Sequence, residues 1–226
     1  MNQGLFVTGT DTGVGKTLVA CALLHAFAAR GHSVIGMKPV AAGREYGRYA
    51  DVDALIAASN VHAQMKLVNP YAFEPPIAPH IAADELGVTM SLDVMHDAYR
   101  ALSRQADVVI VEGAGGFMIP LNASETSADL ACMLGLPVVL VVGMRLGCIN
   151  HAMLTRRAIE DQGLACAGWV ANTLDSNMLN FKENMLFLSE CLEAPLIASI
   201  PRLEAPNSFE CASYLSLEAM KGASGE

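Results

Sequence analysis

The stretch "LFVTGTDTGVGKT", Leu5 to Thr17, begins with apolar residues and runs into a glycine-rich turn that closes on Lys16 and Thr17. Glycines allow consecutive backbone N–H groups to point at one anion, and the N-terminus of a following helix adds a positive dipole end. In such a turn Lys16 would reach the outer phosphates of a nucleotide, and the Thr17 hydroxyl would contact Mg²⁺. The stretch therefore predicts a strand, a phosphate-binding loop and a helix in succession.

The loop departs from the usual pattern G-x-x-x-x-G-K-[ST], because Thr10 stands at the first glycine position and Gly9 comes one residue early. An ordinary strand-to-helix turn with a solvated lysine is the alternative. The flanking residues favour the phosphate loop, since "TLVACALLHAFAARG" has apolar residues at helical spacing and ends at a glycine.

Composition sets the broad class of the protein. A chain of 226 residues that is 53% hydrophobic and 16% charged is long enough for one domain with a substantial core, which we expect to span 1–226. No apolar run is long enough to cross a bilayer and the start "MNQG" lacks a basic segment, so we expect a cytoplasmic protein without a membrane partner. The net charge of −9 disfavours nucleic acid as a partner. The six cysteines lie far apart, without the spacing of a zinc site or a disulfide framework, and are expected to be small core residues.

Further along the chain, strand-like segments alternate with helical ones. The strand-like segments are "HSVIGMKPVAAG", "ADVVIVEGAGG", "LPVVLVVG", "CAGWVANTL" and "PLIASIPRL". Such alternation, with strands that are apolar nearly throughout, predicts an α/β fold: a mainly parallel sheet with helices on both faces. Ligands in that architecture bind at the carboxyl ends of the strands. The proline-rich stretch "NPYAFEPPIAPH", Asn69 to His80, is expected to be an ordered loop over that edge.

Charged residues at the predicted strand ends are candidates for the site. Glu112 closes an apolar strand before "GAGG" and is favoured as a Mg²⁺ ligand over a surface glutamate. Asp53 is less certain, because an acid in the first turn of a helix is the simpler interpretation. Lys38, alone at the end of an otherwise uncharged strand, could equally be a site residue or an isolated lysine.

Three residues near the later strands are further candidates. Asn150 could help to bind a carboxylate at a helix start or could simply cap the helix. Cys148 is interpreted as a buried thiol rather than a nucleophile, because no His and acid partners are recognisable. The amide of Asn172 has a donor and an acceptor that suit an adenine edge.

The motifs "GTDTGVGKT", "KPVAAG", "NPYAFEPPIAPH", "VEGAGG", "LGCINHAMLT" and "GWVAN", in this order and at these spacings, resemble the dethiobiotin synthetase family from about Leu5 to Leu203. The resemblance implies a P-loop nucleoside triphosphate hydrolase fold. It also implies ATP- and Mg²⁺-dependent closure of 7,8-diaminopelargonate with CO₂ to a cyclic urea, which gives dethiobiotin, ADP and phosphate, in a homodimer. The longer glycine spacing of the first motif is a mark of that family.

The family's site residues can be carried over by motif. Those expected around the nucleotide are Asp11, Thr12, Gly13, Val14, Gly15, Lys16, Thr17, Leu18, Glu112, Gly115, Asn172, Pro201 and Leu203. Those expected around the diamine are Thr12, Lys38, Ala42, Gly115, Cys148, Ile149 and Asn150. The Mg²⁺ ligands would be Thr17, Asp53 and Glu112, and the catalytic residues Lys16 and Lys38. The resemblance thus raises Asp53 above its simpler interpretation.

The sequence departs from the family in three places. Ala42 stands where close relatives have serine, Gly13 replaces an acid found in some of the phosphate loops, and "NMLNFKENMLFLSECL" lacks a tyrosine that reaches across the dimer in relatives. Two rivals remain. A partition-type ATPase would carry a second lysine where Thr10 to Thr12 stand, and a switch GTPase would carry N-K-x-D where "NTLD" has Thr173.

Overall fold

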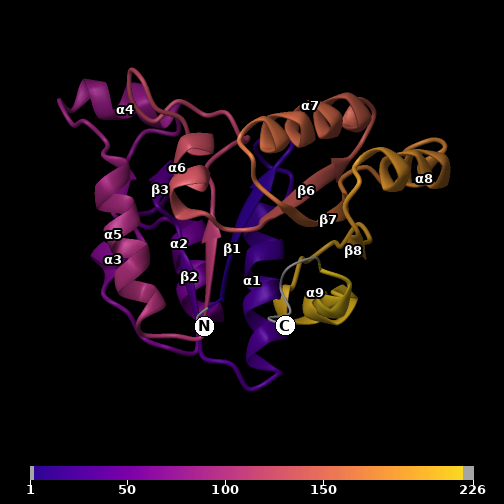
Figure 1. Ribbon diagram of the computed structural model, residues 1–226, viewed down its shortest axis with the longest axis horizontal. Coiled ribbons are helices and arrows are strands. Elements are labelled where there is room, and N and C mark those ends of the chain that lie inside the picture. The colour runs from indigo at the N-terminus through magenta and orange to yellow at the C-terminus, as the bar shows by residue number, and fades with distance from the viewer. Residues whose placement is uncertain (1–2, 221–226) are drawn as a thin grey trace.

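The computed structural model describes residues 3–220, and its centre is a six-stranded sheet (Figure 1). The strands are all parallel and lie in the order β2-β5-β1-β6-β7-β8. Their bounds are β1 Gln3–Gly9, β2 Val34–Met37, β5 Val108–Glu112, β6 Val138–Met144, β7 Cys166–Thr173 and β8 Leu196–Ile200. The predicted parallel sheet is confirmed. A pair of short parallel strands, β3 Val40–Ala42 and β4 Tyr71–Phe73, was not predicted.

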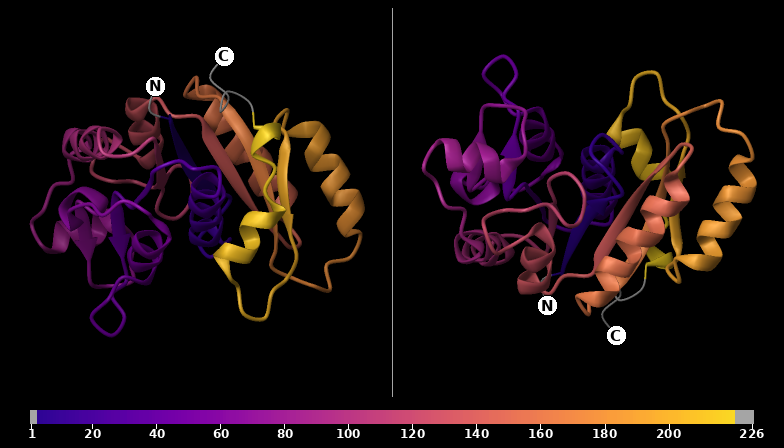
Figure 2. Two further views of the ribbon diagram at one scale, coloured as in Figure 1. Left: turned by 90° about the horizontal axis from the view of Figure 1, so that it is seen from below. Right: turned by 90° about the horizontal axis from the view of Figure 1, so that it is seen from above.

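Helices cover both faces of the sheet, as expected for strands that are apolar on both sides. The bounds of the helices are α1 Lys16–Ala28, α2 Ala50–Ala58, α3 Met65–Val68, α4 Pro79–Glu85, α5 Leu92–Ser103, α6 Ser127–Leu134, α7 Cys148–Asp161, α8 Phe181–Cys191 and α9 Ser208–Cys211. Two 3₁₀ turns, Ala212–Tyr214 and Leu217–Ala219, follow. Figures 1 and 2 show how these helices surround the sheet.

The alternation of side chains along β6 shows how the two faces are filled. Val139 and Val141 pack in the same core cluster as the α1 residues Leu23 and Leu24. Leu140, whose side chain points to the opposite face, packs in another cluster together with residues of α7 and α8. Each fully buried leucine of this kind contributes about 1.5–3 kcal/mol relative to an exposed one. The core thus fixes the sheet from both sides, and the carboxyl ends of its strands form one common edge.

The glycine-rich loop between β1 and α1 is held by β6 and β7. The N–H of Thr10 donates to Val141 O at 3.0 Å, and Asn172 Nδ2, at the end of β7, donates to Val14 O at 2.8 Å. Gly13 and Gly15 have φ angles of 73° and 94°, which L side chains rarely adopt. The predicted strand, glycine turn and helix are therefore present in the predicted order.

Two further expectations can be compared with residues 3–220. In that part of the chain no helix has both the length and the apolar character needed to span a membrane. The cysteines are not all core residues: Cys132 is exposed and Cys191 is partly exposed, whereas the other four are buried. Cys132 lies in the last turn of α6, where the neighbouring Met133 is exposed as well.

We predict that alanine is tolerated differently at the two glycines. Both changes place alanine in left-handed backbone, which costs about 1–2 kcal/mol. A Cβ at Gly13 would meet nothing within 4 Å, whereas at Gly15 it would lie 2.2 Å from Asn172 Nδ2. Gly15→Ala should therefore also break the buried hydrogen bond to Val14 and lose about 1–3 kcal/mol more. Urea unfolding of the two variants measures the difference, and equal losses would contradict this account of the loop.

Candidate functional site

A cavity of about 710 Å³ lies at the carboxyl ends of β1, β2 and β5. One part of its wall is polar and contains the glycine-rich loop with Lys16 and Thr17, together with Lys38, Asp51 and Glu112. The rest is largely apolar: Val40, Ala42, Pro76, Ile77, Ala78, Pro79, Ala114, Ile119 and Pro120. The part of the proline-rich stretch from Pro76 to Pro79 therefore lies at this edge, as expected. The expectation that the whole stretch is loop was wrong, because it contains β4 and the first residues of α4.

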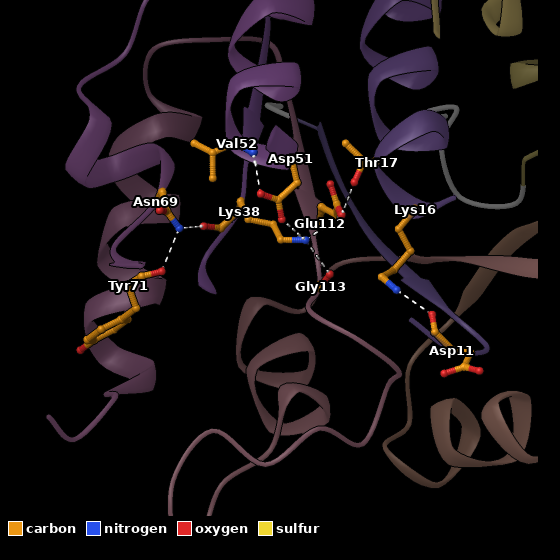
Figure 3. A network of polar contacts seen from close by, with 10 residues as sticks. All are labelled: Asp11, Lys16, Thr17, Lys38, Asp51, Val52, Asn69, Tyr71, Glu112 and Gly113. Atoms are coloured by element: carbon orange, nitrogen blue, oxygen red, sulfur yellow. Dashed lines mark hydrogen bonds and ion pairs between the residues drawn. The ribbon is translucent and has the colours of Figure 1, made fainter. Parts of the chain in front are cut away.

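Lys38 lies at the centre of the polar part (Figure 3). Its Nζ is 2.7 Å from Glu112 Oε1 and 3.0 Å from Asp51 Oδ2, and it donates to Gly113 O at 3.3 Å. The backbone is fixed as well, because Asn69 Nδ2 donates to Lys38 O at 2.7 Å. A buried ammonium is therefore held by two carboxylates from two other elements.

The two lysines of the site differ in their electrostatics. Burial acts to lower the pKa of Lys38, but the Glu112 and Asp51 carboxylates outweigh it and raise that pKa above its ordinary value. Lys16 has a pKa lowered to about 8, first by burial and then by repulsion from Lys38, with Glu112 and Asp11 acting in the opposite direction. Its Nζ donates to Asp11 O at 2.8 Å. Lys38 thus stays positive, whereas Lys16 pairs with no carboxylate among residues 3–220 and is suited to an incoming anion.

The Mg²⁺ ion implied by the resemblance fits Glu112 and Thr17. Glu112 Oε1 accepts from the Thr17 hydroxyl at 2.8 Å, and Oε2 is buried without a hydrogen-bond partner among residues 3–220. A buried carboxylate oxygen without a partner is costly unless it has a ligand. No group of three His, Cys, Asp or Glu side chains in the described chain could hold a metal ion. A site made of the Glu112 carboxylate and the Thr17 hydroxyl matches Mg²⁺, which takes few carboxylates and completes its shell with phosphates and water.

The acids of α2 are arranged differently from the expectation. Asp53, expected at the metal, pairs with Arg48 Nε at 2.7 Å and does not line the cavity. Asp51 does line it and was missed. The only signal in the sequence was "ADVD", with two acids in one helical turn and no indication of which faces the strand ends.

The residues expected around the nucleotide divide into three groups. Lining the cavity are Thr12, Gly13, Gly15, Lys16, Thr17, Glu112 and Gly115. Outside that lining, Val14 and Asn172 are buried and Leu18 and Leu203 partly buried, whereas Asp11 is partly exposed and Pro201 exposed. The Asp11 carboxylate pairs with Arg145 Nη2 at 2.6 Å.

The residues expected around the diamine are only partly brought together. Thr12, Lys38, Ala42 and Gly115 line the cavity. Cys148, Ile149 and Asn150 form the start of α7 and do not line it. Cys148 is buried, and burial raises the pKa of its thiol, which is consistent with a packing role rather than a nucleophile. The apolar wall between Pro76 and Pro79 was not predicted as part of the site.

The solved structures that resemble this chain share its fold. MinD of Aquifex aeolicus matches with a TM-score of 0.58 at 16% identity, over 94% of this chain and 88% of that one. MinD of Pyrococcus horikoshii, solved with Mg-ADP, matches with a TM-score of 0.55 at 15% identity, over 93% of this chain and 86% of that one. At such identities the likeness confirms the α/β fold and says nothing of the reaction.

Sequence relatives are much closer. A family model described as an AAA domain matches residues 3–208. A protein of Nitrosospira multiformis named ATP-dependent dethiobiotin synthetase is 55% identical, over 96% of both chains. A protein of the same name from Aromatoleum aromaticum is 50% identical, over 94% of this chain and 96% of its own. The chain therefore belongs to the family of ATP-dependent dethiobiotin synthetases.

Proposed function

We propose that this enzyme uses ATP and Mg²⁺ to join CO₂ to 7,8-diaminopelargonate and close the cyclic urea of dethiobiotin, releasing ADP and phosphate. The observation that carries the proposal is the buried ammonium of Lys38, fixed at a strand end beside the phosphate loop. It supplies a positive charge outside the loop, where a negatively charged acceptor would meet the γ-phosphate. The names of the close relatives support the same reaction.

The reaction needs no covalent bond to the protein. One amine of the substrate attacks CO₂ and loses a proton, which gives a carbamate. A carbamate oxygen then attacks the γ-phosphorus, the bond to ADP breaks, and a carbamic-phosphoric anhydride forms. The second amine attacks the carbamate carbon, loses a proton and expels phosphate, which closes the ring. The protein must neutralise charge and align oxygen with phosphorus.

The charged residues suit these steps. Lys38 would bind the carbamate, and Lys16 the outer phosphates of ATP, so that both negative partners meet between fixed positive charges. Thr17 and Glu112 would hold Mg²⁺, with Asp53 as the further ligand that the resemblance implies. When bound, the ion supplies additional neutralisation of phosphate charge. Fixed charges in a buried site need little reorganisation as the transition state forms.

The apolar wall suits the carbon chain of the diamine. Val40, Ala42 and the segment Pro76 to Pro79 face the same cavity as Lys38, so a substrate with its amines at Lys38 could lay its methylenes along them. Ala42, where relatives have serine, adds apolar surface to this wall. Burial of such a chain contributes about 0.8 kcal/mol per methylene.

The carboxylate end of the diamine is proposed to bind a second copy of the chain. Cys148, Ile149 and Asn150 begin a 14-residue helix whose N-terminus favours an anion, yet they do not line the cavity of their own chain. A homodimer would bring the start of α7 of one copy to the cavity of the other. We further propose that Asn172, Pro201 and Leu203 lie near the base of ATP and that the enzyme is cytoplasmic.

The first test is the dependence of nucleotide turnover on both other substrates. Because the acceptor oxygen arises only when diamine and CO₂ combine, phosphate release from ATP and Mg²⁺ should require both diamine and bicarbonate. Phosphate release and dethiobiotin, measured by mass spectrometry, should be equimolar. Equally fast phosphate release without diamine or bicarbonate would favour a switch ATPase and refute the synthetase proposal.

Substitution of the two lysines should impair different steps of the reaction. Lys16→Met should weaken ATP binding and also abolish ring formation. Lys38→Met should bind ATP almost normally, whereas single-turnover ring formation falls by about 10²–10³, as on loss of one preorganised charge contact. Circular dichroism checks folding, because Lys38→Met leaves buried carboxylates without their cation. If raising ATP alone rescued Lys38→Met, Lys38 would be a nucleotide contact only.

Mixing inactive variants tests the shared site. Lys38→Met and Asn150→Ala should each turn over slowly at low diamine. In a mixed dimer one of the two cavities would have both Lys38 and Asn150 intact. Unfolding and refolding the two chains together should therefore recover up to about a quarter of wild-type activity by random pairing. No recovery, with mixed dimers verified by mass spectrometry, would place Asn150 outside the partner's cavity.

A further inference from the structure

The strand that leads to Lys38 lies at the edge of the six-stranded sheet. β2 is the first strand in the order, and within residues 3–220 only β5 pairs with it. On its outer side, the N–H of Val34 donates to Asn60 Oδ1 at 2.7 Å, and the N–H of Gly36 donates to Ser59 Oγ at 2.9 Å. Side chains of the segment after α2 therefore satisfy donors that a further strand would otherwise pair.

The end of β2 is held from the same side by Asn69 and the residue before it (Figure 3). The N–H of Lys38 donates to Val68 O at 2.8 Å. Asn69 Nδ2 donates to Lys38 O at 2.7 Å and to Tyr71 O at 2.9 Å, so both hydrogens of this buried amide are used. The N–H of Asn69 in turn donates to Met65 O at 2.7 Å. Two consecutive residues of one segment thus fix both backbone groups of Lys38.

Two prolines explain why a side chain is needed at this point. Lys38 is followed by Pro39, and Asn69 is followed by Pro70. Because proline has no N–H to donate, the two backbones cannot form a complete ladder of hydrogen bonds where they first meet. The regular pairing of β3 with β4 begins one residue after each proline. The amide of Asn69 supplies the donor that the prolines lack.

We propose that Asn69 is a positioning residue for the Lys38 ammonium. The proposal deepens the proposed function and rests on its placement of the carbamate at Lys38. Glu112 and Asp51 contact the ammonium at the tip of the side chain, whereas Asn69 fixes the backbone from which that side chain starts. Both ends matter, because a displacement of about 1 Å at a reacting group can cost about 10²-fold in rate.

The principal alternative is that Asn69 supports the start of β4 and serves the fold alone. A double-mutant cycle with Lys38→Met separates the two roles. Asn69→Ala should lower kcat and the single-turnover rate of ring formation by about tenfold to a hundredfold, and leave KM for ATP within about twofold. In the Lys38→Met background, the same change should lower the residual single-turnover rate by less than about twofold, because the group that Asn69 positions is already absent. The urea midpoint should fall in both backgrounds.

Asn60 provides a matched control at the other end of β2. Its Oδ1 accepts from the N–H of Val34 and its Nδ2 donates to His32 O at 2.9 Å, so it also makes two hydrogen bonds to the backbone. Asn60→Ala should lower the urea midpoint but leave kcat within about twofold of wild type. In the ligand-free proteins, hydrogen exchange measured by NMR should be faster at the Lys38 N–H in Asn69→Ala and at the Val34 N–H in Asn60→Ala.

Several outcomes would overturn the proposal. An equal loss of ring formation in both Lys38 backgrounds would show that Asn69 does not act through Lys38. A comparable loss of kcat in Asn60→Ala, or an unchanged kcat in Asn69→Ala, would do the same. Should Asn69→Ala not fold, Asn69→Ser, which keeps one short donor, enters the same cycle, and failure of both variants to fold would assign Asn69 to the fold alone. If wild type made no dethiobiotin, the proposed function would fail, whereas hydrogen exchange would still test whether Asn69 fixes the end of β2.

Discussion

The site depends on one interaction, the contact between the Lys38 ammonium and the Glu112 carboxylate. Lys38 is 5% exposed and Glu112 is 1% exposed, so both charges have lost most of their water. Such a pair is stable only with good geometry and additional partners. The sheet provides the geometry, because β2 and β5 are neighbours with Met37 opposite Val111. Lys38 directly follows β2, and Glu112 is the last residue of β5. Asp51, Thr17 and Gly113 O provide the additional partners.

Most of the fold could be predicted because its signals are local. Each strand is a short apolar run, and the phosphate loop is marked by its glycines and by the strand and helix beside it. Glu112 was a candidate for the same reason, since it directly closes a strand. The short pair β3 and β4 was missed, because three-residue strands carry no periodicity and depend on pairing between Val40–Ala42 and Tyr71–Phe73.

The choice between Asp51 and Asp53 could not be made from the sequence. In a helix of 3.6 residues per turn, two positions two residues apart point in directions roughly 200° apart. If one acid faces the cavity, the other faces away. Which one does so is set by the packing of Val52 and Leu55 into the core, and both acids look alike in a local pattern. Here Asp51 pairs with Lys38 and Asp53 with Arg48. For Asp53 to bind a metal at Glu112, it would have to release Arg48.

The fold alone does not distinguish this enzyme from the MinD proteins that share it. The loop and the helix after it bind phosphate through backbone N–H groups and a dipole, which do not depend on what attacks the γ-phosphorus. Selection of the attacking group must come from the other strand ends. Water is small, neutral and always present, so a site that only bound ATP would favour hydrolysis. A fixed ammonium at the end of β2 favours an anionic oxygen over water, and the apolar wall from Pro76 to Pro79 favours an acceptor that carries a carbon chain. On our proposal, the substrate preference of this chain is therefore determined beside the phosphate loop, where a buried charge and an apolar surface line the same cavity.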